Sequence, residues 1–99
     1  MAVRKEYKKE LLSIIDNYLP DCAVYLFGSR ARGTHNVGSD IDLAIDAGTI
    51  IDGARMSLLK EDIESSNVPL FVDVVDLQAV SSDMSRQVEN EGIIWKKKN

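Results

Sequence analysis

The chain has 99 residues, of which 44% are hydrophobic and 28% are charged, and its formal net charge is −4. This composition excludes a disordered chain, and the length predicts one domain, residues 1–99, with no room for a second. A core of this size is only just large enough to fold alone, so the chain is a candidate for a homodimer or a hetero-oligomer. The acidic balance argues against direct binding to nucleic acid.

No stretch approaches the roughly 20 apolar residues that span a bilayer, and the N-terminal segment lacks the continuous apolar stretch of a signal peptide. The single cysteine, Cys22, cannot form an internal disulfide, which is typical of a reducing compartment. It precedes a short apolar run, so we expect its side chain in or near the core. These features predict a cytoplasmic protein with no membrane contact.

The first segments predict a helix, a strand and a second, short helix. Apolar residues recur at helical spacing through residues 4–19, with Lys and Glu between them, and Pro20 stops this amphipathic helix. The apolar run 22–27 predicts a buried strand. A short helix then starts at Ser29, and Gly33 can end it.

The loop composition of residues 34–39 separates this short helix from a second strand, residues 40–45. That strand alternates, so one side carries Ile41, Leu43 and Ile45, and the other carries Asp40, Asp42 and Ala44. Residues 50–66 predict a helix with one apolar face, formed by Ile51, Leu58, Leu59 and Ile63. Residues 70–77 predict a third strand, with Pro69 just before it.

Near the C-terminus, Ser81 or Ser82 can cap a helix that carries Met84 and Val88 inward, and residues 92–95 predict a short edge strand. The alternation of helices and strands predicts an α/β (α+β) domain with helices packed against a small sheet. Periodicity leaves the pairing of the second and third strands open, because either a hairpin or a crossover can join them.

Asp40 and Asp42 are two residues apart, so their carboxylates project from one face of a strand. Two anions this close repel each other, and a cation between them relieves the repulsion. Oxygen ligands alone indicate Mg²⁺ or Mn²⁺ rather than zinc. An exposed strand face would give the same pattern, so this pair does not decide by itself.

Asp73 lies among apolar residues of the third predicted strand, where a carboxylate is costly unless it is paired or bound to metal. If this strand lies beside residues 40–45, Asp73 completes a three-carboxylate cluster with Asp40 and Asp42. Such a cluster can hold two metal ions, an arrangement used in phosphoryl chemistry. The alternative is that Asp73 faces water on an edge strand.

Gly28 and Ser29 stand at the turn between the first strand and the short helix. Glycine lets the backbone approach a phosphate, the start of the helix offers free N–H groups to an anion, and Ser29 adds a hydroxyl. Arg30 and Arg32 can supply positive charge to a triphosphate, although both could equally be solvated helix residues. The sequence contains neither a P-loop nor a dinucleotide fingerprint. The turn is therefore a candidate nucleotide-binding element.

The loop after the short helix holds further candidates. Ser39 is a candidate nucleotide-binding residue, and with Thr34 and Asn36 it can hold the loop or orient the carboxylates by hydrogen bonds. His35 is a weaker candidate, because a lone histidine in a loop is more often simply exposed.

Gly28-Ser29, ten residues and then Asp40-Ile41-Asp42 resembles the signature of the polymerase-beta-type nucleotidyltransferase superfamily, with Asp73 in the place of its third carboxylate. The short length and the runs LFGSRARG and SDIDLAI most resemble the minimal nucleotidyltransferase (MNT) proteins of prokaryotes. The resemblance covers residues 4–95. It implies the minimal fold of that superfamily, a small mixed sheet flanked by helices.

The resemblance also implies an activity. Such enzymes transfer a nucleoside monophosphate from a nucleoside triphosphate to an acceptor hydroxyl and release pyrophosphate. It implies ATP as substrate and Mg²⁺ or Mn²⁺ as cofactor, with Asp40 and Asp42 binding the metals and Asp73 helping to bind the metal that activates the acceptor. Family members often act as antitoxins beside a HEPN-domain ribonuclease toxin, and some attach AMP to a tyrosine of that toxin.

We therefore expect a metal-dependent AMP transferase that modifies a partner HEPN toxin and so acts as its antitoxin. Two other interpretations stay open: an antitoxin that neutralises its toxin by binding alone, and a nucleotidyltransferase with a small-molecule acceptor in a dimer cleft. Larger relatives carry extra domains that hold the acceptor. With 99 residues, this chain is expected to receive its acceptor site from another polypeptide.

Overall fold

A four-stranded sheet organises the chain, and a computed structural model describes residues 2–98 of it. The elements follow in the order α1 (Lys5–Tyr18), β1 (Ala23–Phe27), α2 (Ser29–Arg32), β2 (Ile41–Asp46), α3 (Gly53–Glu64), β3 (Val72–Asp76), α4 (Ser82–Glu91) and β4 (Ile93–Lys96). The helix and strand predictions are confirmed, with bounds that differ by at most three residues at any end.

The sheet is mixed, with the strand order β3-β2-β1-β4. Strand β1 pairs antiparallel with both β2 and β4, whereas β2 and β3 run parallel. The question that periodicity left open is thereby answered, because α3 is the crossover that a parallel pair requires. Strands β3 and β4 form the two edges.

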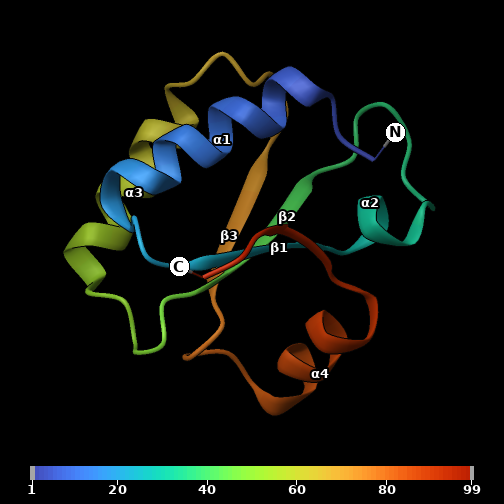
Figure 1. Ribbon diagram of the computed structural model, residues 1–99. Coiled ribbons are helices and arrows are strands. Elements are labelled where there is room, and N and C mark those ends of the chain that lie inside the picture. Colours follow the sequence, from blue (N-terminus) through green and yellow to red (C-terminus); the bar gives the residue numbers. More distant parts are fainter. Residues whose placement is uncertain (1, 99) are drawn as a thin grey trace.

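Helices pack on both faces of the sheet (Figure 1). Helices α1 and α3 cover one face, where most of the core lies, and fully buried members there include Leu11, Ile15, Leu43, Ile45 and Leu59. Burial of each such side chain stabilises the fold by about 1.5–3 kcal/mol. Helix α4 lies on the other face, where Val88 packs with Phe27 and Ala44 in a smaller cluster. The side of β2 that carries Asp42 is therefore the side that α4 partly covers.

Several local features that the sequence predicted are present in the structure. The Ser81 side chain accepts a hydrogen bond from the Met84 backbone N–H at 3.3 Å and caps α4. Gly33 ends α2 in the left-handed conformation, with φ of 79°. Cys22 is fully buried, as expected. Among residues 2–98, no helix is long and apolar enough to cross a membrane.

One core prediction was wrong. Leu58 was expected on the buried face of the third helix with Leu59 and Ile63, but 51% of its surface is exposed. Helix α3 buries only Leu59 and Ile63, which are four residues apart, and Leu58 lies one residue around the helix from that narrow face. Ile51 is buried, but it precedes the helix.

Candidate functional site

Asp42 and Asp73 are direct neighbours in the parallel pair β2 and β3. Both belong to the set of alternate residues that faces α4, because Ile41 and Leu43 face the opposite core. Asp42 is half-buried and Asp73 is exposed. Asp73 therefore faces water on an edge strand, as one interpretation of the sequence expected. It also lies beside the Asp42 carboxylate, as the carboxylate-cluster interpretation expected.

Asp40 is placed differently from the prediction. It lies just before β2, not within it, and is exposed. It is still close enough to Asp42 for its charge to act there. Burial, followed by the charges of Asp73 and Asp40, raises the pKa of the Asp42 carboxyl, and the nearby Arg32 guanidinium opposes this rise. Negative charge at Asp42 is therefore incompletely compensated by the protein itself.

A divalent cation is suited to this excess of negative charge, since the three side chains offer only hard oxygen donors. Among residues 2–98, however, no three acidic, His or Cys side chains are already grouped as a metal-binding set. Asp42 and Asp73 are register neighbours whose side chains share one face of the sheet, so they are the two carboxylates best suited to hold one metal ion together. Asp40 is exposed and lines the same cavity as the other two carboxylates.

The Gly28 turn packs directly against Asp42. Gly28 has φ of 76° and ψ of −158°, which side chains rarely adopt. A Cβ atom at this position would lie 3.1 Å from Asp42 Cγ and would overlap the carboxylate oxygen Oδ2. Glycine is required here because the backbone passes so close to the carboxylate.

These residues line one cavity of about 650 Å³. Its wall combines the Gly28-Ser29 turn, Arg32, Ser39 and all three candidate carboxylates with Asn36 and Gly38 of the loop. Two further lining residues, Met84 and Gln87, come from α4 and were not predicted as site residues. Their spacing on an amphipathic helix indicated a face but not what that face covers.

Arg32 is held in this cavity by α4. One guanidinium nitrogen lies 2.9 Å from the Glu91 carboxylate, which also accepts a hydrogen bond from the Gln87 side chain at 2.7 Å. The hydrogen bond from Gln87 is the main cause that lowers the pKa of Glu91. Arg32 remains 44% exposed, so it is available to a bound triphosphate.

Arg30, which was predicted to bind nucleotide with Arg32, does not line this cavity. Its side chain is 6% exposed and donates hydrogen bonds to the backbone carbonyls of Ala2, Val37 and Ser39, at 2.9–3.1 Å. Each of the three side-chain nitrogens of Arg30 thereby donates to a backbone carbonyl. This geometry favours a structural role, in which Arg30 fixes the loop that leads to Asp40.

The same loop is held by its own polar side chains. The Ser39 hydroxyl accepts a hydrogen bond from the Asn36 N–H at 3.0 Å, and the Asn36 side chain accepts one from the Gly38 N–H at 3.0 Å. The prediction that Asn36 and Ser39 hold the loop agrees with these contacts. Thr34 is exposed, and its backbone N–H donates to the Ser29 carbonyl at 3.0 Å.

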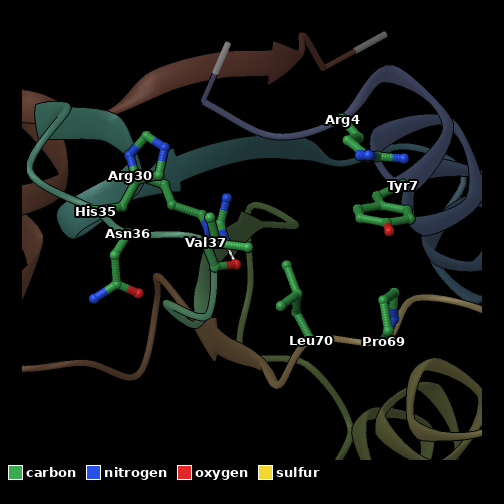
Figure 2. Close-up of a pocket in the computed structure, with 8 residues that line it drawn as sticks. All are labelled: Arg4, Tyr7, Arg30, His35, Asn36, Val37, Pro69 and Leu70. Atoms are coloured by element: carbon green, nitrogen blue, oxygen red, sulfur yellow. Dashed lines mark hydrogen bonds between the residues drawn. The ribbon is translucent and has the colours of Figure 1, made fainter.

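A second pocket, of about 530 Å³, lies on the other side of this loop (Figure 2). Arg4 stacks over the Tyr7 ring at one end, and Arg30 reaches across from α2 to Val37. His35 lines this pocket and not the carboxylate cavity. Its Nδ1 is buried and has no hydrogen-bond partner among residues 2–98. His35 is therefore not placed as a member of the carboxylate site.

Comparison with known proteins places this geometry in a family. The family model described as "Polymerase beta, Nucleotidyltransferase" matches residues 9–99, almost the whole chain. The chain belongs to this nucleotidyltransferase family. The family assignment agrees with the fold and with the resemblance found in the sequence, and it makes a nucleoside triphosphate the class of substrate for this enzyme.

Two curated nucleotidyltransferases are similar to the chain. One is named probable protein adenylyltransferase MntA of Haemophilus influenzae, 29% identical over 98 residues that cover 99% of this chain and 86% of the relative. The other, protein adenylyltransferase MntA of Shewanella oneidensis, is 30% identical over 86 residues, 86% of this chain. The match spans only 61% of that longer relative.

Chains of solved structures have the same fold. A chain from a toxin–antitoxin crystal structure with AMP-PNP superposes with a TM-score of 0.79 and 28% identity, covering 93% of this chain and 74% of that chain. A complex of AMPylated Shewanella oneidensis HEPN toxin with its MNT antitoxin gives a TM-score of 0.75 and 24% identity, covering 95% and 72%. The mixed sheet with helices on both faces is therefore the minimal nucleotidyltransferase fold.

Proposed function

We propose that this nucleotidyltransferase transfers AMP from ATP to a tyrosine hydroxyl of a HEPN-domain toxin, and that it acts in the cytoplasm as the antitoxin. The observation that carries the proposal is the pairing of Asp42 with Asp73 beside the Gly28 turn, in one cavity. The protein acceptor follows from the names of the curated relatives, and the HEPN toxin from the MNT resemblance.

Different residues are suited to bind the triphosphate and the metal ion. The Gly28-Ser29 turn leaves room for a phosphate next to Asp42, and Arg32 and Ser39 line the cavity where the triphosphate would lie. Asp42 and Asp73, joined by Asp40, would hold Mg²⁺ or Mn²⁺. When bound, this ion supplies positive charge for the phosphates and lowers the pKa of the acceptor hydroxyl.

The transfer itself is a substitution at the α-phosphorus of ATP. The acceptor oxygen forms a bond to this phosphorus, the bond from the phosphorus to the α,β-bridging oxygen breaks, and pyrophosphate leaves. The hydroxyl proton is released to a carboxylate or to water. The position of Asp73 on β3, which has no strand beyond it among residues 2–98, supports a role for this residue in orienting the acceptor.

The test is incubation of the purified chain with α-labelled ATP, Mg²⁺ and the HEPN-domain partner, followed by intact mass measurement of both proteins. We expect AMP on a partner tyrosine and no AMP when Asp73→Asn replaces the parent. If the partner stays unmodified but is still inhibited, the antitoxin acts by binding alone. If a small-molecule hydroxyl is labelled in place of the protein, the acceptor assignment is wrong.

A further inference from the structure

Glu91 is an acidic residue that lies beside the carboxylate cavity without lining it. It is the last residue of α4, and its side chain is 21% exposed. Arg32 and Gln87 line the cavity, whereas Glu91 does not. No motif of the sequence indicated a role for this residue. Glu91 is therefore placed to act on a ligand in the cavity through the residues that it contacts.

One oxygen of the Glu91 carboxylate joins two side chains of the cavity wall. This oxygen, Oε1, accepts hydrogen bonds from Nη1 of Arg32 at 2.9 Å and from Nε2 of Gln87 at 2.7 Å. The hydrogen bond from Gln87 is the largest cause that lowers the pKa of Glu91, and the Arg32 charge and the Gly28 backbone N–H act in the same direction. Three parts of the cavity wall, from β1, α2 and α4, therefore meet at one carboxylate.

Arg32 gains from such an anchor because its side chain is long and partly in solvent, with 44% of it exposed. An arginine side chain loses rotamer freedom when a ligand fixes it, and this loss weakens binding. A side chain that is already held has less freedom to lose. The contact with Glu91 uses one guanidinium N–H group, and the remaining groups of the fork are left for a phosphate.

The carboxylates of the site are the alternative partners of Arg32 if this anchor is lost. Burial and the charges of Asp73 and Asp40 raise the pKa of the Asp42 carboxyl, and Arg32 opposes this rise, so its charge reaches the carboxylates. Among residues 2–98, however, the ion pair that Arg32 forms is with Glu91 and not with any of these aspartates. A guanidinium that turned to the aspartates would leave the triphosphate and would take a position suited to a metal ion.

We propose that Glu91 is a positioning residue for the nucleotide: it holds Arg32 against α4, ready for the triphosphate, and keeps it away from the site carboxylates. This inference rests on the proposed function and names the residue that prepares the site for ATP. Gln87 completes the arrangement, because its amide fixes the same carboxylate oxygen that Arg32 contacts. Glu91 thereby strengthens ATP binding without touching the nucleotide.

Charge alone would give the opposite effect. A carboxylate near the triphosphate repels it, so removal of Glu91 would strengthen ATP binding if this residue only reduced the positive charge of Arg32. Solvent screens the charges of a partly exposed pair, which leaves the ordering of the side chain as the larger contribution. The second hydrogen bond, from Gln87 to the same oxygen, also favours positioning, because it fixes the carboxylate and adds no charge.

The test compares two substitutions of Glu91. Glu91→Ala removes the anchor, whereas Glu91→Gln removes the charge but keeps an oxygen that can accept from Arg32 and Gln87. Glu89→Ala is the matched control, because it makes the same change on the same helix, at an exposed residue that forms no ion pair within residues 2–98. The affinity of each chain for ATP with Mg²⁺ is measured by calorimetry.

We expect Glu91→Ala to weaken ATP binding at least about fivefold, Glu91→Gln to stay within about twofold of the parent, and Glu89→Ala to match the parent. Tighter ATP binding by both Glu91 variants would show that charge dominates and would overturn the inference. Unchanged ATP affinity in Glu91→Ala would overturn it as well, while leaving the proposed function intact. A parent chain that binds no ATP would instead refute the proposed function.

A double-mutant cycle shows whether Glu91 acts through Arg32 and separates this role from a general loss of structure. Glu91→Ala is combined with Arg32→Met, and ATP affinity is measured for the parent, both single variants and the double variant. If Glu91 positions Arg32, Glu91→Ala has no further effect on affinity once Arg32 has been replaced. A loss of affinity in the Arg32→Met background equal to the loss in the parent would overturn the inference, because Glu91 would then act independently of Arg32.

Discussion

Gly28→Ala tests the link between the turn and the carboxylates. An alanine here must adopt φ of 76° and ψ of −158°, a conformation that costs on the order of 1–3 kcal/mol for a residue with a side chain. Each kcal/mol lowers the Tm of a domain of this size by about 4–8 °C. The new methyl group also overlaps Asp42 Oδ2, so the carboxylate must move by roughly 1 Å, a displacement that typically reduces a reaction rate about 100-fold.

The control for this substitution is Gly33→Ala. Gly33 also has positive φ, 79°, but no atom lies within 4 Å of the position its Cβ would take. We expect both variants to lose stability in thermal melts, and only Gly28→Ala to lose AMP transfer when the rate is divided by the folded fraction. Equal rates per folded molecule in the two variants would refute the reasoning that Gly28 positions Asp42.

Three further predictions follow from the site. Asp42→Asn should raise the Tm at pH 7, because folding raises the pKa of Asp42 and the charged carboxylate therefore destabilises the folded state. This gain in Tm should vanish in melts below about pH 3, where the aspartate is protonated in both the folded and the unfolded state. Arg30→Met should lower the free energy of unfolding by about 2–4 kcal/mol in denaturant titrations, since it leaves backbone carbonyls without a donor. Arg32→Met should lower it by under about 1 kcal/mol but should weaken ATP binding. ATP binding measured by calorimetry should weaken strongly when EDTA removes divalent ions, and equal affinity with and without the chelator would contradict a metal-bridged nucleotide.

Hydrophobic spacing was sufficient to predict most of the fold. The helices, the strands and the α4 cap each depend on neighbouring residues, so local patterns define them. The direction of pairing between β2 and β3 depends on the path of α3, which no local pattern contains. The exposure of Leu58 also depends on packing, because it lies just beside the narrow face that α3 buries.

The candidate site was predicted in part. The motif around Gly28, Asp42 and Asp73 could be read from the sequence, because a β-strand period and one register place them together. Arg30 and Arg32 could not be separated, since both belong to a one-turn helix. They are two residues apart and point to nearly opposite sides, and only tertiary packing decides which side faces the loop and which faces the cavity. The contribution of α4 likewise depends on packing between distant segments.

The most direct measurement is the single-turnover rate of AMP transfer to the HEPN-domain partner for Asp42→Asn and Asp73→Asn, each corrected for its folded fraction. Asp83→Asn serves as the control, because Asp83 is an exposed residue of α4 whose replacement changes the net charge equally. If the carboxylate pair is the reaction centre, both site variants lose transfer by orders of magnitude and Asp83→Asn keeps the parent rate. Transfer by either site variant at the parent rate would contradict the account.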